Sequence, residues 1–108
     1  MKFNPMGPNM NKMMKEARKV QEQIVQMQEE LRQREMVVTS GGGAVTVRVN
    51  GKQEILSLKI APEAVDPDDV EMLEDMIIAA VNEAVKQSQD MVSAEMAKIT
   101  GGFNIPGL

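Results

Sequence analysis

Four cationic side chains near the start of the chain are the residues best suited to bind a ligand. They are Lys12, Lys15, Arg18 and Lys19. On a helix, this spacing keeps all four away from the apolar seam of the same segment, so they form one basic patch. Phosphate groups are the natural partners of clustered Lys and Arg side chains. The alternative is an ordinary solvated helix face. If the patch binds phosphate, four further cations extend it: Arg32, Arg34, Arg48 and Lys59.

The charges are divided unevenly along the chain. Residues 1–61 carry ten basic and six acidic groups, whereas residues 62–108 carry two basic and ten acidic groups, which together give the net charge of −4. A mixed-sign surface of this kind serves solubility in any domain. The more specific interpretation is an anion-binding first half on an otherwise acidic molecule.

Several kinds of chemistry are disfavoured by composition. The chain has no Cys, no His, no Trp and no Tyr, so we expect no zinc site, no thiolate nucleophile, no usual general base and no aromatic platform for stacking bases. Helix capping explains the first members of the acidic cluster at residues 66–74, so we assign no metal. Gly41, Gly42 and Gly43 precede a strand and lack a following Gly-Lys-Ser/Thr, so they indicate a turn. We expect no enzyme activity, no cofactor and no small-molecule substrate.

The 108 residues suit a single domain spanning 1–108, with loosely ordered tails at 1–8 and 101–108. The longest apolar run is the six residues from Met76 to Val81, which is too short to cross a bilayer. The start of the chain also lacks the apolar stretch of a secretory signal. We therefore expect a cytoplasmic protein without a membrane partner.

A heptad pattern predicts a long helix from about residue 9 to about residue 34. Its apolar residues alternate at spacings of three and four: Met10, Met13, Ala17, Val20, Ile24, Met27 and Leu31. Strand formers begin at Met36, and the three glycines at 41–43 must end that strand in a turn. This pattern predicts a first helix followed by a first strand.

Two further strands are indicated by alternating apolar residues. Val45, Val47 and Val49 share one face of the first, and Leu56 and Leu58 are expected on the same side of the return strand. Asn50-Gly51 predicts a type I′ hairpin with a two-residue turn. In that register, the numbers of any two paired residues add up to 101. The alternative is a four-residue loop, in which the numbers of paired residues add up to 103. In either register the opposite face presents polar residues: Thr46, Arg48, Ser57 and Lys59.

A second long helix is expected from the Asp66-Pro67 start signal to about Ile99. Asp66 is predicted to cap it and Pro67 to occupy its first position. A helix of this length measures roughly 45–50 Å, whereas a compact sphere of this chain length is only about 34 Å across. The helix must therefore project, and its two adjoining apolar stripes, one of which includes Ala80 and Ala84, need a partner. We predict an obligate homodimer.

The residues also resemble a known family. The pieces are Asn11-Lys12-Met13-Met14-Lys15, Gly43-x-Val45-x-Val47, Asn50-Gly51-x-x-Glu54, Leu58-x-Ile60-x-Pro62 and the closing stretch Gly101-Gly102-Phe103-Asn104-Ile105-Pro106-Gly107. In this order they resemble the YbaB/EbfC nucleoid-associated proteins. The resemblance implies an α+β fold with a small antiparallel sheet between two helices, and a tweezer-shaped homodimer. It also implies binding to double-stranded DNA that alters DNA conformation, with roles in nucleoid organisation and gene regulation.

The alternative hypothesis is a coiled-coil chaperone or protein-interaction module of the prefoldin type. Such a module also places hairpins between two long helices, but it needs helices of similar length that share one antiparallel seam. The second helix is predicted to be longer and to have a broader apolar face, which favours the DNA-binding interpretation.

Overall fold

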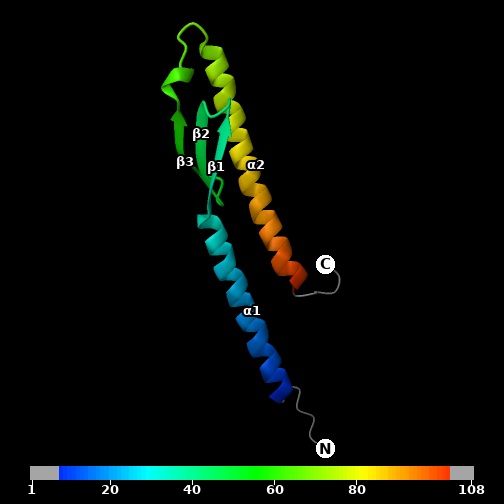
Figure 1. Cartoon of the computed structure of the whole chain (residues 1–108). Coiled ribbons are helices and arrows are strands. Elements are labelled where there is room, and N and C mark those ends of the chain that lie inside the picture. Colours follow the sequence, from blue (N-terminus) through cyan, green and yellow to red (C-terminus); the bar gives the residue numbers. More distant parts are fainter. Residues whose placement is uncertain (1–7, 103–108) are drawn as a thin grey trace, which may run out of the picture. The chain divides into compact units, whose positions relative to one another are not determined.

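The computed structural model describes residues 8–102, which form two long helices and one three-stranded antiparallel sheet (Figure 1). The predicted α+β class is confirmed. The two tails expected to be loose lie, apart from Pro8, Gly101 and Gly102, outside the described residues. The elements in chain order are α1 (Pro8–Gln33), β1 (Glu35–Ser40), β2 (Val45–Asn50), β3 (Ile55–Ile60), the short 3-10 helix η1 (Pro62–Ala64) and α2 (Val70–Gly102).

The chain divides into two units, one ending at Glu30 and the other beginning at Leu31. The first unit contains α1 up to Glu30. The second contains the last turn of α1, the sheet and α2. The 26 residues of α1 match the predicted span to within one residue at each end. In neither helix, over the part of the chain that the structure describes, is there a stretch apolar enough to cross a bilayer.

The core lies between the sheet and α2. The strand order is β1-β2-β3, and α2 packs against β1 and β2 (Figure 1). The alternation predicted for β2 is confirmed, because Val45, Val47 and Val49 are fully buried. Burying one such side chain contributes about 1.5–3 kcal/mol relative to leaving it in water. The buried residues of this core are Val38, Val45, Val47, Val49, Ala80 and Ala84.

Small side chains let α2 approach the sheet closely. Ala80, Ala84 and Ser88 recur at every fourth position and are fully buried, so they form the line of α2 nearest the strands. Hydrogen bonds attach α2 at both ends of this line. Ser40 Oγ donates to the Met76 carbonyl (2.8 Å), and Ser88 Oγ donates to the Asn50 carbonyl (2.7 Å). Twelve helical residues span about 18 Å, the length of a six-residue strand.

The predicted type I′ turn at Asn50-Gly51 is wrong. Gln53 donates its backbone N–H to the Asn50 carbonyl (3.0 Å), and the residue with positive φ is Gln53 (64°) instead of Gly51. The Asn50 side chain stabilises this longer loop, because its Oδ1 accepts from the backbone N–H groups of Lys52 and Glu54. Three-residue hairpin loops of this kind end in a left-handed residue.

The longer loop also changes the strand register. Leu58 lies opposite Val47 and Ile60 opposite Val45, so the paired numbers sum to 105, and neither predicted register is correct. A register shift between Arg48 and Val49 places Ile55 opposite Val49. Val47 and Leu58 still lie on the same face of the sheet, as predicted. The observed register of these residues differs from each predicted one by an even number of residues, and such a shift keeps both side chains on their predicted face.

Glycine is needed at position 51 because the backbone of Leu31 lies very close to it, and not because of a positive φ. A Cβ atom at Gly51 would overlap the backbone carbonyl of Leu31, which belongs to the last turn of α1. Leu31 itself is only 1% exposed. The predicted glycine turn at 41–43 is confirmed, since all three glycines have positive φ.

The start of α2 is later than predicted. Asp69 caps the helix, because its Oδ1 accepts the backbone N–H of Met72 (3.2 Å). Asp66 instead accepts the N–H of Asp68 (2.9 Å) in a turn that precedes the helix. α2 therefore begins at Val70, and it continues to Gly102, three residues beyond its predicted end.

Candidate nucleic-acid interface

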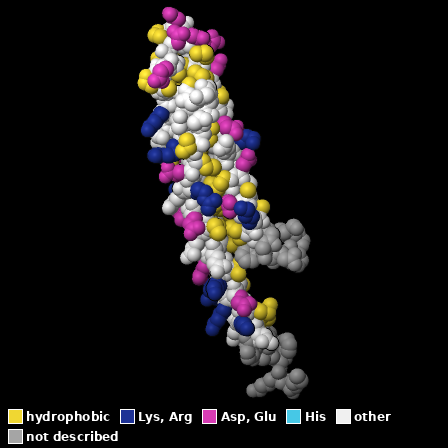
Figure 2. Space-filling view, in the orientation of Figure 1, with side chains coloured by type: hydrophobic (Ala, Val, Ile, Leu, Met, Phe, Trp, Pro, Cys, Tyr) yellow, Lys and Arg dark blue, Asp and Glu magenta, His cyan; other side chains and the backbone are white. Residues whose placement is uncertain are grey.

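The first candidate surface is the basic patch on α1, formed by Lys12, Lys15, Arg18 and Lys19. All four side chains are exposed, and all lie in the first unit. Within residues 8–102 none of the four forms an ion pair. The eight residues from Lys12 to Lys19 cover about 10 Å of helix. The basic patch therefore presents four exposed cations that are available to an anionic partner. Figure 2 shows Lys and Arg side chains at the surface of the helix that Figure 1 labels α1.

The second candidate surface is the outer face of the sheet, on the side away from α2. The register places Lys59 opposite Thr46, and Arg48 opposite Ser57. Since Thr46 and Arg48 are two residues apart on β2, all four share one face, as predicted. We call these residues the outer sheet face. It combines two cations with hydroxyl groups, which are the side chains that contact phosphate oxygens in protein–DNA complexes.

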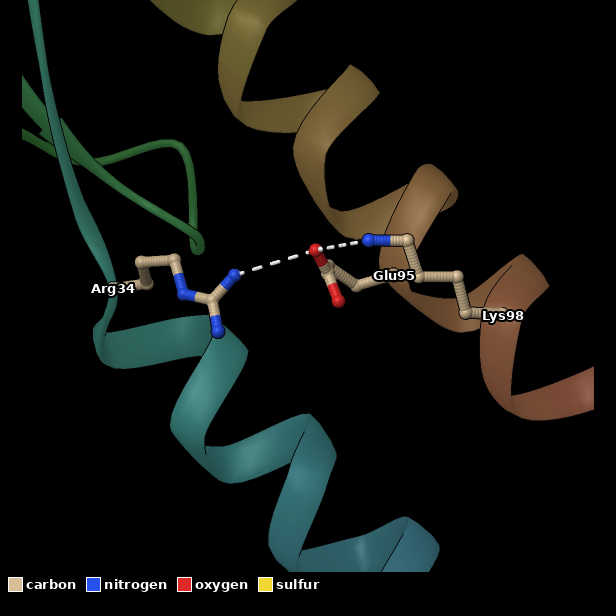
Figure 3. A network of polar contacts seen from close by, with 3 residues as sticks. All are labelled: Arg34, Glu95 and Lys98. Carbon is tan, nitrogen blue, oxygen red and sulfur yellow. Dashed lines mark hydrogen bonds and ion pairs between the residues drawn. The ribbon is translucent and has the colours of Figure 1, made fainter.

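Among the predicted cations in the described part of the chain, Arg34 and Arg48 lie close to carboxylates. Arg48 Nε lies 2.9 Å from Glu35 Oε1 on the neighbouring strand. Arg34 Nη1 lies 3.6 Å from Glu95 Oε1 on α2, and Lys98 Nζ approaches the same oxygen at 3.2 Å (Figure 3). Both arginines are about half exposed, so water screens these pairs, and each contributes at most about 1 kcal/mol. A phosphate group can compete for either guanidinium.

Arg32 lies in the last turn of α1, within the second unit. A cation at this position interacts favourably with the carbonyl end of the helix. Arg32 is exposed and has interactions of its own within the described chain. The structure thus groups Lys12, Lys15, Arg18 and Lys19 on one helix and Arg48 with Lys59 on one sheet face, whereas Arg32 and Arg34 flank the junction of α1 and β1.

The predicted site omits one polar residue of the outer sheet face and one cation of the loop between β2 and β3. Thr39 lies opposite Thr46 in the sheet register and is exposed, so it adds a hydroxyl group to the outer sheet face. Lys52 is exposed in the loop between β2 and β3. Thr39 could have been predicted, because it follows the apolar Val38 in an alternating strand pattern. The wrong turn type concealed Lys52, because a two-residue turn leaves no loop to display it.

One part of the second unit is strongly acidic, and this part is unsuited to binding phosphate. Between Lys59 and Lys86 the chain has eight carboxylates and no Lys or Arg. Figure 2 shows acidic side chains together with apolar ones at the end of the unit where α2 begins. Because like charges repel, a nucleic acid would avoid this end. Among the described residues no group of three or more acidic side chains is arranged to hold a metal ion.

Comparisons with known proteins place the chain among relatives of similar length. A nucleoid-associated protein of Desulforamulus reducens is 62% identical over 103 residues, covering 95% of this chain and 98% of that protein. One from Pelotomaculum thermopropionicum is 58% identical over 103 residues, with the same coverage. The crystal structure of an uncharacterized protein from Helicobacter pylori matches with a TM-score of 0.54 at 24% identity, covering 82% of this chain and 95% of that one, which supports the fold. The model of the YbaB/EbfC DNA-binding family matches residues 6–103, and this chain therefore belongs to that family.

Proposed function

We propose that this chain is a nucleoid-associated protein of the bacterial cytoplasm that binds double-stranded DNA as a homodimer, largely through the phosphate backbone, and alters its conformation. Nucleoid organisation and gene regulation are the roles that follow. The observation that carries the proposal is the basic patch, whose four cations form no ion pair within the described chain. Family membership and the names of the relatives support it.

Backbone contact is favoured over base readout because of the side chains available. Lys and Arg contact phosphates in any sequence, whereas sequence reading needs a helix or strand that enters a groove with matched donors and acceptors. The absence of Trp and Tyr disfavours stacking on single strands. We propose Lys12, Lys15, Arg18 and Lys19 as the main contacts, with Arg32, Arg34, Arg48 and Lys59 as additional ones.

The proposed homodimer is supported by apolar side chains that the single chain leaves exposed. β3 lies at the edge of the sheet, beyond the cover of α2, and its Leu56 and Leu58 are 42% and 38% exposed. Ile78 on α2 is 57% exposed. An open strand edge beside such side chains invites pairing with another chain. A second copy that covers these residues would shield both the open strand edge and the apolar side chains from water.

The salt dependence of DNA binding tests the proposed contacts. With about four to six phosphates neutralised, a plot of log K against log salt concentration should have a slope near −4 to −5. Replacing Lys15 and Arg18 by Gln should weaken binding and reduce that slope. A matched variant with Lys86 and Lys98 replaced by Gln changes the net charge equally but should bind as the unmodified protein does. Equal weakening in both variants would contradict the proposed site.

Sedimentation at micromolar concentration tests the dimer separately. The unmodified chain should sediment as a dimer, and Leu58→Lys should lower the association constant at least about tenfold, because a buried unpaired charge is costly. A stable, folded monomer of the unmodified chain would overturn the dimer proposal. Binding to unfolded proteins without binding to DNA at low salt would instead favour the chaperone alternative.

A further inference from the structure

A shallow groove lies in the second unit, where the Gly41 turn meets the first turns of α2. Its volume is about 420 Å³. Met72, Met76 and Ala79 line it with apolar surface, and Asp69, Glu71 and Asp75 line it with carboxylates. We call it the acidic groove. Met72 is 46% exposed although it is a large apolar side chain. Such a mixture of flexible apolar surface and charge is typical of grooves that bind helices.

The carboxylates of the acidic groove are only partly used by the fold. Asp69 caps α2 through Met72. Glu71 and Asp75 lie one helical turn apart and form no ion pair within residues 8–102. No Lys or Arg occurs between residues 60 and 85 to neutralise them. The occupant that suits the acidic groove is therefore a helix with exposed apolar side chains and adjacent cations.

The first turns of α1 have these properties. Met10 and Met14 are 42% and 47% exposed, and they lie one turn apart on the helix. Arg18 lies one turn beyond Met14, and Lys15 is adjacent to it in sequence; both cations are exposed. The two surfaces therefore carry unpaired charges of opposite sign beside exposed methionine side chains.

We propose that the acidic groove binds the first turns of α1 of another copy of this chain, so that Met10 and Met14 pack on Met72 and Met76 while Lys15 and Arg18 pair with Glu71 and Asp75. The contact joins two different surfaces, so it does not close on itself as a symmetric dimer contact does. Repetition of the contact extends an assembly from copy to copy. It is distinct from the contact proposed for β3 and Ile78.

Ion pairs at an exposed groove are screened by salt, so this assembly is sensitive to ionic strength. The contact also uses Lys15 and Arg18, which the proposed function assigns to DNA. If that assignment is correct, DNA and the acidic groove compete for α1, and added duplex disperses the assembly. The self-association itself does not depend on the proposed function.

Sedimentation velocity of the full chain without DNA tests the proposal. At about 20 mM salt we expect species larger than those present at about 500 mM salt, where the Debye length is only a few ångströms. The variant Lys15→Glu/Arg18→Glu and the variant Glu71→Lys/Asp75→Lys should each associate at least about tenfold more weakly. A mixture of the two variants should assemble again, because each then offers the charge that the other lacks.

A matched control carries the same charge change on α2 outside the groove. Glu83→Lys/Asp90→Lys should assemble as the unmodified chain does, and circular dichroism should show equal helix content in every variant. Glu71→Gln/Asp75→Asn, which removes the charges without reversing them, should give an intermediate loss. The proposal fails if the unmodified chain shows no salt-sensitive assembly, or if the mixture of reversed variants does not assemble. If only the groove variant loses assembly, the assignment of α1 as the occupant is wrong.

DNA binding by the groove variant distinguishes this proposal from the proposed function. Glu71→Lys/Asp75→Lys should bind duplex DNA at least as well as the unmodified chain, because it retains the basic patch and loses negative charge. Lost assembly with retained DNA binding supports both proposals. Retained assembly in this variant overturns the groove proposal whatever the affinity for DNA.

Discussion

Replacing Gly51 by Ala should strongly destabilise the fold, although Ala is ordinarily the more favourable residue. The Cβ atom would overlap the carbonyl carbon and oxygen of Leu31 and lie 3.0 Å from the Arg32 Cα. All three are backbone atoms, which cannot rotate away as a flexible side chain can. The loop between β2 and β3 would have to separate from the last turn of α1, where the Leu31 carbonyl also accepts the N–H of Arg34 (3.3 Å).

The expected loss in the free energy of unfolding is about 3 kcal/mol, the upper part of the range for added atoms in a packed site. Gly42→Ala is the matched control. Nothing lies within 4 Å of a Cβ atom at Gly42, but its φ of 67° is unfavourable for Ala. Its cost should be only about 1 kcal/mol, from backbone strain. The pair therefore separates steric overlap from conformational strain at two turn glycines.

Urea unfolding followed by circular dichroism is the appropriate assay, because the chain has no Trp or Tyr to report by fluorescence. Protein concentration must be held constant, since the stability of the proposed dimer would depend on it. A Gly51→Ala variant as stable as the unmodified chain would refute the close approach of Leu31 to the loop. A larger loss for Gly42→Ala than for Gly51→Ala would show that backbone strain dominates instead.

Three further substitutions test contacts of the loop and of α2. Ser88→Ala should cost about 1 kcal/mol in urea unfolding, because the Asn50 carbonyl loses a buried donor but retains the N–H of Gln53. Gln53→Gly should stabilise by a few tenths to about 1 kcal/mol in the same assay, since it relieves a φ of 64°. The pKa of Lys86 is raised above 10.5 by its hydrogen bond to Asp90, so this pair stabilises the fold below pH 10.5 and is lost as the pH rises through the higher folded-state value. Lys86→Gln should therefore reduce the fall in melting temperature above about pH 10.

The elements themselves were predictable because their signals are local. The heptad seam predicts α1, three successive glycines predict the turn before β2, and the alternation of Val45, Val47 and Val49 predicts a strand buried on one face. Ala80 and Ala84 belonged to the predicted apolar stripe and are buried. In each case the period of the sequence pattern is the period of the backbone.

The details that failed depend on contacts between residues distant in sequence. Asn50-Gly51 favours a two-residue turn by itself, but Leu31 lies against Gly51 and the Asn50 side chain caps a longer loop. Ser88, which donates to the Asn50 carbonyl, interrupts the apolar stripe of α2 and gives no signal of its buried role. These contacts follow from tertiary packing, which overrides the local preference of a turn.

The candidate site shows the same division between local and distant information. Helical spacing alone groups Lys12, Lys15, Arg18 and Lys19, so the basic patch could be predicted. The ion pairs of Arg34 and Arg48 could not, because Glu95 is distant in sequence and Glu35 is brought to Arg48 only by the strand register. Counting charges in the sequence therefore overestimates how many cations of the second unit are available to phosphate, because Arg34 and Arg48 already pair with carboxylates.

The separation of charge along the chain has a consequence for regulation. The proposed DNA binding gains nothing from the seven carboxylates between Glu63 and Asp75, because those carboxylates repel a duplex. If the cations of the basic patch can pair either with phosphates or with Glu71 and Asp75 of another copy, ionic strength and DNA concentration together set how much protein is available to bind. Variants that neutralise the acidic groove should then bind DNA more tightly than the unmodified chain at low salt, and the difference should vanish at high salt. A difference that persists at high salt would show that the groove does not act through charge.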